Sequence, residues 1–289
     1  PEHLKIRNTT ARLARDLEIG NLSIISNSTV DHPPATTETT SYLSIKTNKL
    51  IVDSTSKISA DGRGYLGGRS GGNNSDYGRT LGNSQGSGYD SGGSYGGYGG
   101  KYSTNPVNEI YGSIYEPSDL GSGGGGVAGD PGGNGGGFIK IKAKEIVLDG
   151  VISANGESKG YWSEGGSGGS IFIMVSNLKG SGKIESNGGS PGGGAAGGGG
   201  RVAIYYKDAV GFDLSKVTAY GGISGSGSDA KKNGGAGTVY LKKSGEEGEL
   251  IIDNRSLLES NPTIFPVINP SKITSISANV LEDSTASFM

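Results

Sequence analysis

The stretch NGGGFIKIKAKEIVLDGVISANG, residues 134–156, decides the fold class of this chain. Three glycines lead into a run that alternates apolar and polar residues, with Ile139 and Ile141 on one face and lysines on the other. A period of two predicts a β-strand with one buried face. A second strand over 146–148 and a short third over 151–154 precede the Asn-Gly pair that ends the stretch. The stretch therefore predicts a three-strand unit bounded by glycine.

The same order of glycines and strands recurs along the chain. Units begin at Gly135, Gly168, Gly198 and Gly234, and an earlier copy without the glycine lead begins at Tyr42. Such a period is typical of stacked repeats, in which each unit buries its apolar face against the next. We expect an all-β fold, a parallel β-helix or β-solenoid with long glycine-rich, polyglycine-II-like excursions on one side. A β-sandwich with glycine-rich loops is the alternative, because hairpin turns also fit the sequence.

Most units end in a residue pair that favours a turn. The pairs are Asp-Gly at 61–62, Asn-Gly at 155–156 and 187–188, and Tyr-Gly at 220–221. Asn and Asp tolerate left-handed backbone angles and glycine adopts them freely. We expect left-handed turns at these points, each leading into the next excursion.

The chain divides into three parts by composition. Residues 1–40 form an N-terminal β segment and an extended joint without the glycine signature. Residues 41–250 form the glycine-rich β-solenoid core, with 62–137 as its longest glycine-rich insertion. Residues 251–289 form a C-terminal strand-forming tail. We expect both terminal parts to lie outside the stack.

Glycine makes up 57 of the 289 residues. The absence of a strict triplet excludes collagen, and the interleaved apolar segments argue against simple disorder. Three interpretations of the glycine remain open: a flexible linker, close packing of extended strands whose backbones pair with one another, and bare backbone that contacts a ligand. The excursions recur at the same point of each unit, which predicts that they share one side of the stack.

Composition also limits the function classes. A net charge of −2 gives no large basic field for nucleic acid. The lack of cysteine removes disulfides and thiolate metal sites, and no apolar run reaches the ~20 residues of a membrane span. We expect no cofactor, no metal, no nucleic-acid partner and no membrane span. A start at Pro1 without a signal-like segment fits a processed product or a fragment, and does not argue against secretion.

Four sequence motifs carry a family resemblance. The runs ISADGRGY, IYGSIYEPSDLGSGGGG, GGSGGSIFI and GGGGRVAIYY resemble glycine-rich repeat regions of large predicted surface and secreted proteins of microbes. Similar runs occur in some plant glycine-rich proteins. The resemblance covers residues 43–206. It implies an extracellular, β-rich, structural region and transfers no catalytic residue.

Carboxylates near strand ends are the candidates for chemistry. Asp53, Asp61, Asp149 and Asp213 occupy turn positions in different units. Glycoside hydrolysis needs two carboxylates about 5–10 Å apart, whereas Asp at a turn commonly accepts hydrogen bonds from its own backbone. We expect structural turns, with calcium binding and catalysis as lesser alternatives, and therefore no enzyme activity.

Aromatic residues in the glycine-rich excursions are the candidate ligand-binding residues. Tyr95, Tyr98, Tyr161 and Trp162 could stack on sugar rings. For Tyr161 and Trp162 the alternative is a plug over the end of a small core. Glycosylation motifs occur at Asn8, Asn21, Asn27, Asn73 and Asn254.

These observations favour a non-enzymatic extracellular structural protein. We expect it to be a subunit of a surface filament, sheath or stalk that assembles as a homo-oligomer or homopolymer through its terminal segments, whose strand edges invite association. Simple capping of the stack by these segments is the alternative to assembly. The second functional hypothesis is an adhesin or glycan-binding module, similar to a phage tip, that presents tyrosine- and glycine-rich loops at the cell surface. The third is a polysaccharide-active β-helix enzyme.

Overall fold

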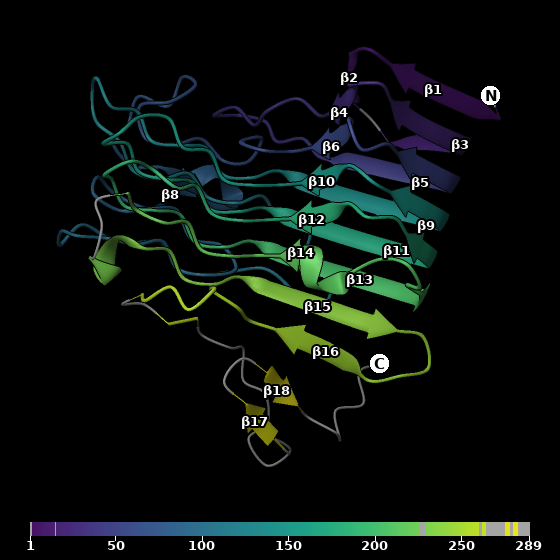
Figure 1. The fold of residues 1–289 in the computed structure, drawn as a ribbon. Coiled ribbons are helices and arrows are strands. Elements are labelled where there is room, and N and C mark those ends of the chain that lie inside the picture. The colour runs from purple at the N-terminus through teal and green to yellow at the C-terminus, as the bar shows by residue number, and fades with distance from the viewer. Residues whose placement is uncertain are drawn as a thin grey trace.

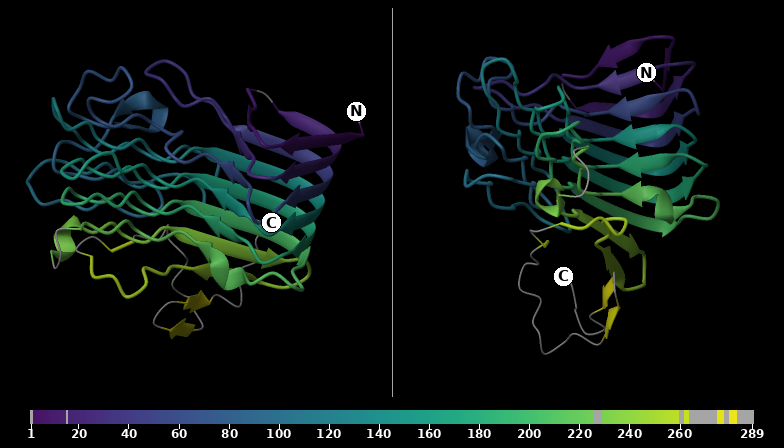
Figure 2. Two further views of the ribbon diagram at one scale, coloured as in Figure 1. Left: turned by 45° about the horizontal axis from the view of Figure 1, so that its top comes forward. Right: turned by 60° about the vertical axis from the view of Figure 1, so that its left-hand side comes forward.

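A computed structural model describes residues 2–14, 16–225, 229–259, 262–263, 275–277 and 280–282. The fold is all-β, with two facing sheets at one side and glycine-rich segments that run away from them in parallel (Figure 1). The two further views show the same separation between the strands and the long connecting segments (Figure 2).

The large sheet is parallel from its first strand to β15 and antiparallel beyond it. Its strands, in spatial order, are β1 (His3–Arg7), β3 (Leu17–Ile25), β5 (Leu43–Val52), β9 (Phe138–Leu148), β11 (Ser170–Lys179), β13 (Arg201–Asp208), β15 (Thr238–Lys243), β16 (Gly248–Ile251), β18 (Val280–Glu282) and β17 (Ser275–Ser277).

The small sheet is parallel throughout and follows the same order along the stack. Its strands are β2 (Thr10–Arg12), β4 (Thr29–Asp31), β6 (Lys57–Ser59), β10 (Val151–Ser153), β12 (Lys183–Glu185) and β14 (Val217–Thr218). Up to β15 the chain passes from a strand of the large sheet to one of the small sheet and then back to the large sheet, one strand further along. From β6 onward each return runs through a glycine-rich segment.

Short strands and 3-10 turns lie in the connecting segments. The antiparallel pair β7 (Arg79–Thr80) and β8 (Ser84–Gln85) encloses the 3-10 turn η1 (Leu81–Asn83). Two further 3-10 turns are η2 (Leu214–Lys216) and η3 (Ala230–Lys232), each preceded by an Asp whose side chain accepts a backbone N–H.

The core between the two sheets consists of in-register apolar columns. In the large sheet Ile45, Ile141, Ile173, Ile204 and Leu241 are directly opposite one another on successive strands. All five side chains are buried. A column of this kind exists because each strand alternates with a period of two, so that a slip of one residue would turn the whole apolar set to solvent.

The predicted faces of β9 are confirmed. Ile139, Ile141 and Ala143 point into the core between the sheets. Lys140 and Lys142 are exposed on the opposite face. Phe138 also lies on that outer face, in a second apolar cluster.

The N-terminal segment corrects one expectation. We expected residues 1–40 to lie outside the stack, but β3 pairs with β5 and β4 pairs with β6. These strands lack a glycine lead yet keep the alternation that the sheets require, with Leu22 and Ile24 fully buried. The C-terminal tail was also expected outside the stack, but β18 pairs with β16 and so joins the large sheet. Residues 260–261, 264–274, 278–279 and 283–289 of the tail lie outside the described residues.

Candidate functional site: the glycine layer, its aromatic rim and an outer trough

A ladder of side-chain acceptors starts each glycine-rich segment. Asp61 Oδ1 accepts the Asn155 N–H at 2.7 Å, and Asn155 Oδ1 accepts the Asn187 N–H at 2.7 Å. Asn187 Oδ1 in turn accepts the Tyr220 N–H at 2.8 Å. These residues form what we call the acceptor ladder, because each side chain satisfies a backbone donor of the next unit along the stack.

The acceptor ladder changes the interpretation of the Asn-Gly and Asp-Gly pairs. Only Gly62 has the expected left-handed backbone, with φ of +61°. Gly156, Gly188 and Gly221 are not left-handed. A Cβ on Gly156 would come within 1.9 Å of the Gly166 carbonyl oxygen. The Asn is thus required for its side-chain acceptor, and the glycine for close packing.

The glycine-rich segments 62–137, 156–169, 188–200 and the described parts of 221–237 (221–225 and 229–237) form one hydrogen-bonded assembly, the glycine layer. Gly136 donates to Ser167 O at 2.8 Å, Gly168 to Gly198 O at 2.9 Å and Gly199 to Gly235 O at 2.9 Å. These bonds join successive segments. The layer is therefore ordered by its own backbone, as in the second of the three interpretations of the glycine content.

The long segment 62–137 folds back between the shorter ones. Gly93 donates to Gly165 O at 2.9 Å, and Gly96 donates to Gly199 O at 3.0 Å. Figure 1 shows these segments side by side, to the left of the strands. The insertion therefore supplies hydrogen-bond partners to segments that are more than a hundred residues away in sequence, as where Tyr98 O accepts the Gly235 N–H at 2.7 Å.

At many glycines of the glycine layer, close backbone contact leaves no space for a side chain. A Cβ built on Gly197 would lie 1.9 Å from Gly166 O, and one on Gly166 would lie 2.0 Å from Asn134 O. Both obstacles are backbone atoms, which cannot rotate away. Glycine is required at such positions by the approach of two backbones and not by an unusual φ.

Tyr95 corrects a sequence-based expectation, because its side chain is fully buried and cannot stack on a glycan. Its hydroxyl lies 2.6 Å from Ser170 Oγ, and its ring centroid lies 4.8 Å from that of Tyr111. The Arg201 guanidinium lies 5.5 Å from the Tyr95 ring centroid. Burial raises the pKa of Tyr95 far above its ordinary value. Tyr95 anchors the glycine layer to β11 and β13.

Tyr98 is half-buried. Its hydroxyl donates to Glu109 Oε2 at 2.6 Å, and this hydrogen bond, together with burial, raises the pKa of Tyr98 to about 12. The ring is held by this bond and is less available to a ligand than the sequence suggested.

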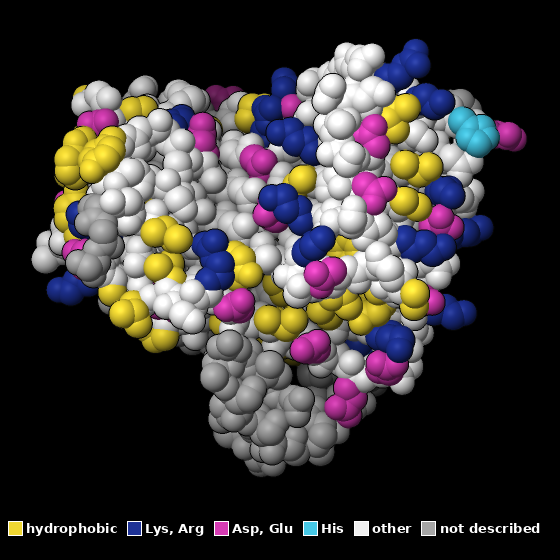
Figure 3. All heavy atoms as spheres, in the orientation of Figure 1, with side chains coloured by type: hydrophobic (Ala, Val, Ile, Leu, Met, Phe, Trp, Pro, Cys, Tyr) yellow, Lys and Arg dark blue, Asp and Glu magenta, His cyan; other side chains and the backbone are white. Residues whose placement is uncertain are grey.

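Tyr161 and Trp162 are the exposed aromatic pair of the glycine layer. Their side chains are 59% and 55% exposed, and their rings meet edge to face with centroids 4.8 Å apart. They pack over Gly192 and Gly193 and do not plug an apolar core. In Figure 3 hydrophobic side chains gather at the left edge, where the glycine-rich segments turn. These two residues keep the geometry expected for a glycan contact.

Glu164 is a buried carboxyl inside the glycine layer. Its Oε1 accepts the Asp90 N–H at 3.2 Å, while Oε2 has no hydrogen-bond partner among the described residues. Burial, reinforced by the charges of Asp90 and Asp130, raises the pKa of Glu164 to about 8. The neutral carboxylic acid is therefore the form that the folded layer favours near pH 7.

The turn carboxylates accept hydrogen bonds. Asp53 Oδ2 accepts the Ser26 N–H at 2.7 Å, a bond that lowers the pKa of Asp53 to about 2. Asp149 Oδ1 accepts the Ser181 N–H at 3.0 Å. Asp213 Oδ1 accepts the Ser215 N–H at 3.1 Å, and its pKa is lowered by bonds to Ser215. Within the described part of the chain no group of three or more His, Asp or Glu could hold a metal ion.

The glycosylation motifs differ in accessibility. Asn8 and Asn27 are exposed, and Asn21 is half-buried. Asn73 is buried and donates to Gly67 O and Tyr77 O at 3.0 and 2.8 Å, so the folded chain cannot present it to a glycosyl transferase. Asn254 accepts the Gly221 N–H at 2.8 Å and thus continues the capping of the layer.

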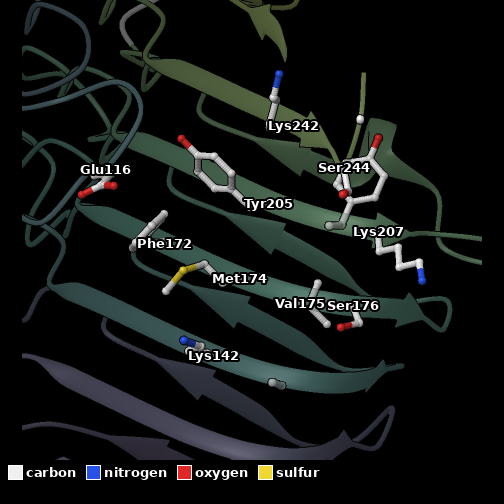
Figure 4. A pocket seen from close by; sticks show the side chains of 13 residues that line it. Glu116, Lys142, Phe172, Met174, Val175, Ser176, Tyr205, Lys207, Lys242 and Ser244 are labelled. Carbon is white, nitrogen blue, oxygen red and sulfur yellow. The ribbon is translucent and has the colours of Figure 1, made fainter. Parts of the chain in front are cut away.

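A trough on the outer face of the large sheet was missed in the sequence. A hollow of about 680 Å³ includes Lys142, Phe172, Met174, Tyr205, Lys207 and Lys242 among its lining residues, and these six define the outer trough (Figure 4). Neighbouring hollows of about 440 and 240 Å³ share lining residues with it. The lysines alternate with core residues along their strands. The sequence therefore predicted that they face solvent, but not that they line one trough.

Comparison of the chain with protein-family models, with curated proteins and with solved structures finds no match. Among the residues that the structure describes, no helix has the length and apolar character needed to cross a membrane.

Proposed function

We propose that the protein is a non-enzymatic structural protein of the cell exterior, a subunit of a surface filament, sheath or stalk. In this proposal the two sheets are walls of a β-solenoid, and the glycine layer is a polyglycine-II-like second wall. The chain path, with parallel strands added in the same order to both sheets, supports the solenoid over the antiparallel hairpins of a β-sandwich.

One observation carries the assembly proposal. β1 and β2 are the outermost strands of the two sheets at the same end of the stack. Leu4, Ala11 and Leu13 pack against the core there but remain partly exposed. A parallel edge with an apolar end is a template for another strand. A further copy of the protein could continue both sheets and the core at once.

The rigidity of such a subunit would come from two sources. The apolar columns hold the sheets together, and the backbone bonds of the glycine layer hold its segments in place without disulfides. The C-terminal tail, residues 251–289, is part of the proposal as a joining segment, and deletion after Asn261 tests that part separately.

The test is assembly of the folded protein, seen by negative-stain microscopy and analytical ultracentrifugation. We expect filaments or end-to-end oligomers, and their loss in the double variant Leu4→Glu/Ala11→Glu. Val210→Glu/Leu258→Glu, which charges two apolar side chains that are 78% and 76% exposed elsewhere, is the matched control. A protein that stays monomeric at high concentration, or a control that disrupts assembly equally, would contradict the proposal.

An adhesin is the second candidate function. It is favoured by the exposed Tyr161 and Trp162 pair on the glycine layer. Glycan-array binding that disappears in Tyr161→Ala/Trp162→Ala and persists in Tyr98→Phe would establish it. An unchanged array profile in the double variant would remove these residues from any glycan site.

A further inference from the structure

We propose that the outer trough binds a linear anionic polysaccharide, with lysines holding carboxylate or sulfate groups and apolar side chains contacting the sugar rings. This inference goes beyond the structural role and does not depend on assembly. It concerns the face of the large sheet that points away from the small sheet.

The register of the strands places the trough residues in a line across the sheet. Lys142, Met174, Tyr205 and Lys242 are directly opposite one another on β9, β11, β13 and β15. Neighbouring strands are ~4.8 Å apart, so the two lysines at the ends of this line are separated by ~14 Å along it. A linear ligand lying across the strands would meet a cation, an apolar floor and a second cation in turn.

The outer trough is positively charged, whereas the whole chain carries a net negative charge. Lys142, Lys207 and Lys242 line the main hollow against one acid, Glu116, although the chain carries a net charge of −2. Among the described residues, the side-chain ammonium groups of Lys142 and Lys207 have no ion pair and no hydrogen bond. Lys242 Nζ donates only to the Glu246 backbone oxygen, at 2.6 Å. These ammonium groups are available to an anion.

The floor of the trough provides apolar contact area. Phe172 and Tyr205 meet edge to face at 89°, with ring centroids 5.8 Å apart, and Met174 is half-buried beside them. Lys140 Nζ lies 5.8 Å from the Phe172 ring centroid. Figure 4 shows Phe172, Met174 and Tyr205 projecting from adjacent strands into the hollow. A shallow floor of this kind suits the apolar face of a sugar ring.

Two other polyanions fit less well. An acidic peptide would bind best by adding a strand to a sheet edge, but the trough lies over strands whose neighbours already pair with them on both sides. Single-stranded nucleic acid needs an extended positive groove with ring faces for base stacking. The trough has a local excess of only two positive charges in its main hollow, and its rings contact each other.

The experiment measures binding of the full chain by isothermal titration calorimetry at low salt. The probes are an oligogalacturonate, its neutral methyl ester and a sulfated galactan oligomer. We expect at least one anionic probe to bind, the methyl ester to bind at least about tenfold more weakly than the free acid, and affinity to fall as salt rises.

Variants locate the site. Lys142→Ala/Lys207→Ala/Lys242→Ala should weaken anionic binding about tenfold or more. Lys57→Ala/Lys216→Ala/Lys231→Ala, which removes the same charge from other surfaces, should change it less than about twofold. Circular dichroism of both triple variants controls for folding.

Failure of both anionic probes to bind at millimolar concentration would overturn the inference. Equal weakening by the two triple variants would also overturn it, as would tighter binding of an oligodeoxynucleotide or a polyglutamate peptide of the same charge. Binding with the expected pattern would support it whether or not the protein forms filaments.

Discussion

The two halves of the molecule are held together in opposite ways. Between the sheets, side chains such as Ile141 and Ile152 fill the space and exclude water. In the glycine layer, backbone carbonyls such as those of Gly166 and Gly198 occupy the positions where side chains would be. The first half tolerates a smaller residue at the cost of a cavity. The second cannot accept even one additional carbon atom at positions such as Gly197 without moving a neighbouring backbone.

Gly197→Ala tests most directly whether the glycine layer tolerates an added carbon atom. Its Cβ would overlap Gly166 O, so we expect destabilisation above about 4 kcal/mol or failure to fold. Gly160→Ala is the matched control, because a Cβ on Gly160 would meet only side-chain atoms at 3.8 Å or beyond, and we expect a change below about 0.5 kcal/mol. Urea denaturation of both variants gives the measurement. A mild effect at Gly197 would mean that the segments can separate freely.

The matching change in the sheet core is Ile152→Ala. Ile152 is fully buried on β10, and we expect a loss of about 2–5 kcal/mol from lost burial and a residual cavity. Ile223→Ala, at a side chain that is 42% exposed, should cost less than about 1 kcal/mol. Thermal and urea unfolding measure both. The comparison fails if the core variant is as damaging as Gly197→Ala.

The pH dependence of stability tests the charge buried in the glycine layer. Glu164 has a pKa of about 8 in the folded chain against 4.5 as the ordinary value. A raised carboxyl pKa means that its stabilising contribution is complete below pH 4.5 and is lost as the pH rises through about 8, on the order of a few kcal/mol. Urea midpoints at pH 5 and pH 9 should differ accordingly, and Glu164→Gln should flatten this slope.

His32 gives the opposite slope and must be separated from Glu164. Burial lowers the pKa of His32 from 6.5 to about 4. Its contribution is complete above pH 6.5 and is lost as the pH falls through about 4. Burial also raises the pKa of Glu259, to about 7, so its contribution is lost in the same direction as that of Glu164. A Glu164→Gln/Glu259→Gln variant that keeps the alkaline loss would show that a further group titrates.

The smallest expected effect concerns the acceptor ladder, where the two halves meet. Asn155→Ala leaves the Asn187 N–H without its acceptor, and we expect a cost of about 1–3 kcal/mol. Asn155→Asp keeps an acceptor oxygen and should cost less. Hydrogen exchange at the Asn187 amide measures the local effect. Unchanged protection in the alanine variant would show that water replaces the side chain.

The sequence predicted the sheets better than the glycine layer, for a physical reason. The alternation of apolar and polar residues along 138–143 indicates which face of the strand is buried. The apolar columns of the core around Ile141 could therefore be predicted from this pattern. Glycine has no side chain, so a run of glycines does not indicate which face of a segment is buried. The burial of Tyr95 depends on the fold of the whole 62–137 segment. No periodic pattern of apolar residues around Tyr95 predicts it.

The outer trough and the acceptor ladder depend on register. Lys142 and Lys242 are a hundred residues apart and become neighbours across two strands only when β9 to β15 are aligned. The Asn of each Asn-Gly pair was noticed, but as a residue that permits a turn. Its side-chain bond to the next unit requires a partner that no single unit contains.

The tight packing of the glycine layer also limits how its gene can change. Every missense change of a glycine codon adds a Cβ, and at positions such as Gly156 and Gly197 the space for that atom is occupied by a carbonyl group. Most glycines of the glycine layer therefore cannot be replaced by point substitution without loss of the fold. Variation among descendants of this gene should instead appear as gain or loss of entire glycine-rich segments, together with replacement of the exposed residues where those segments turn.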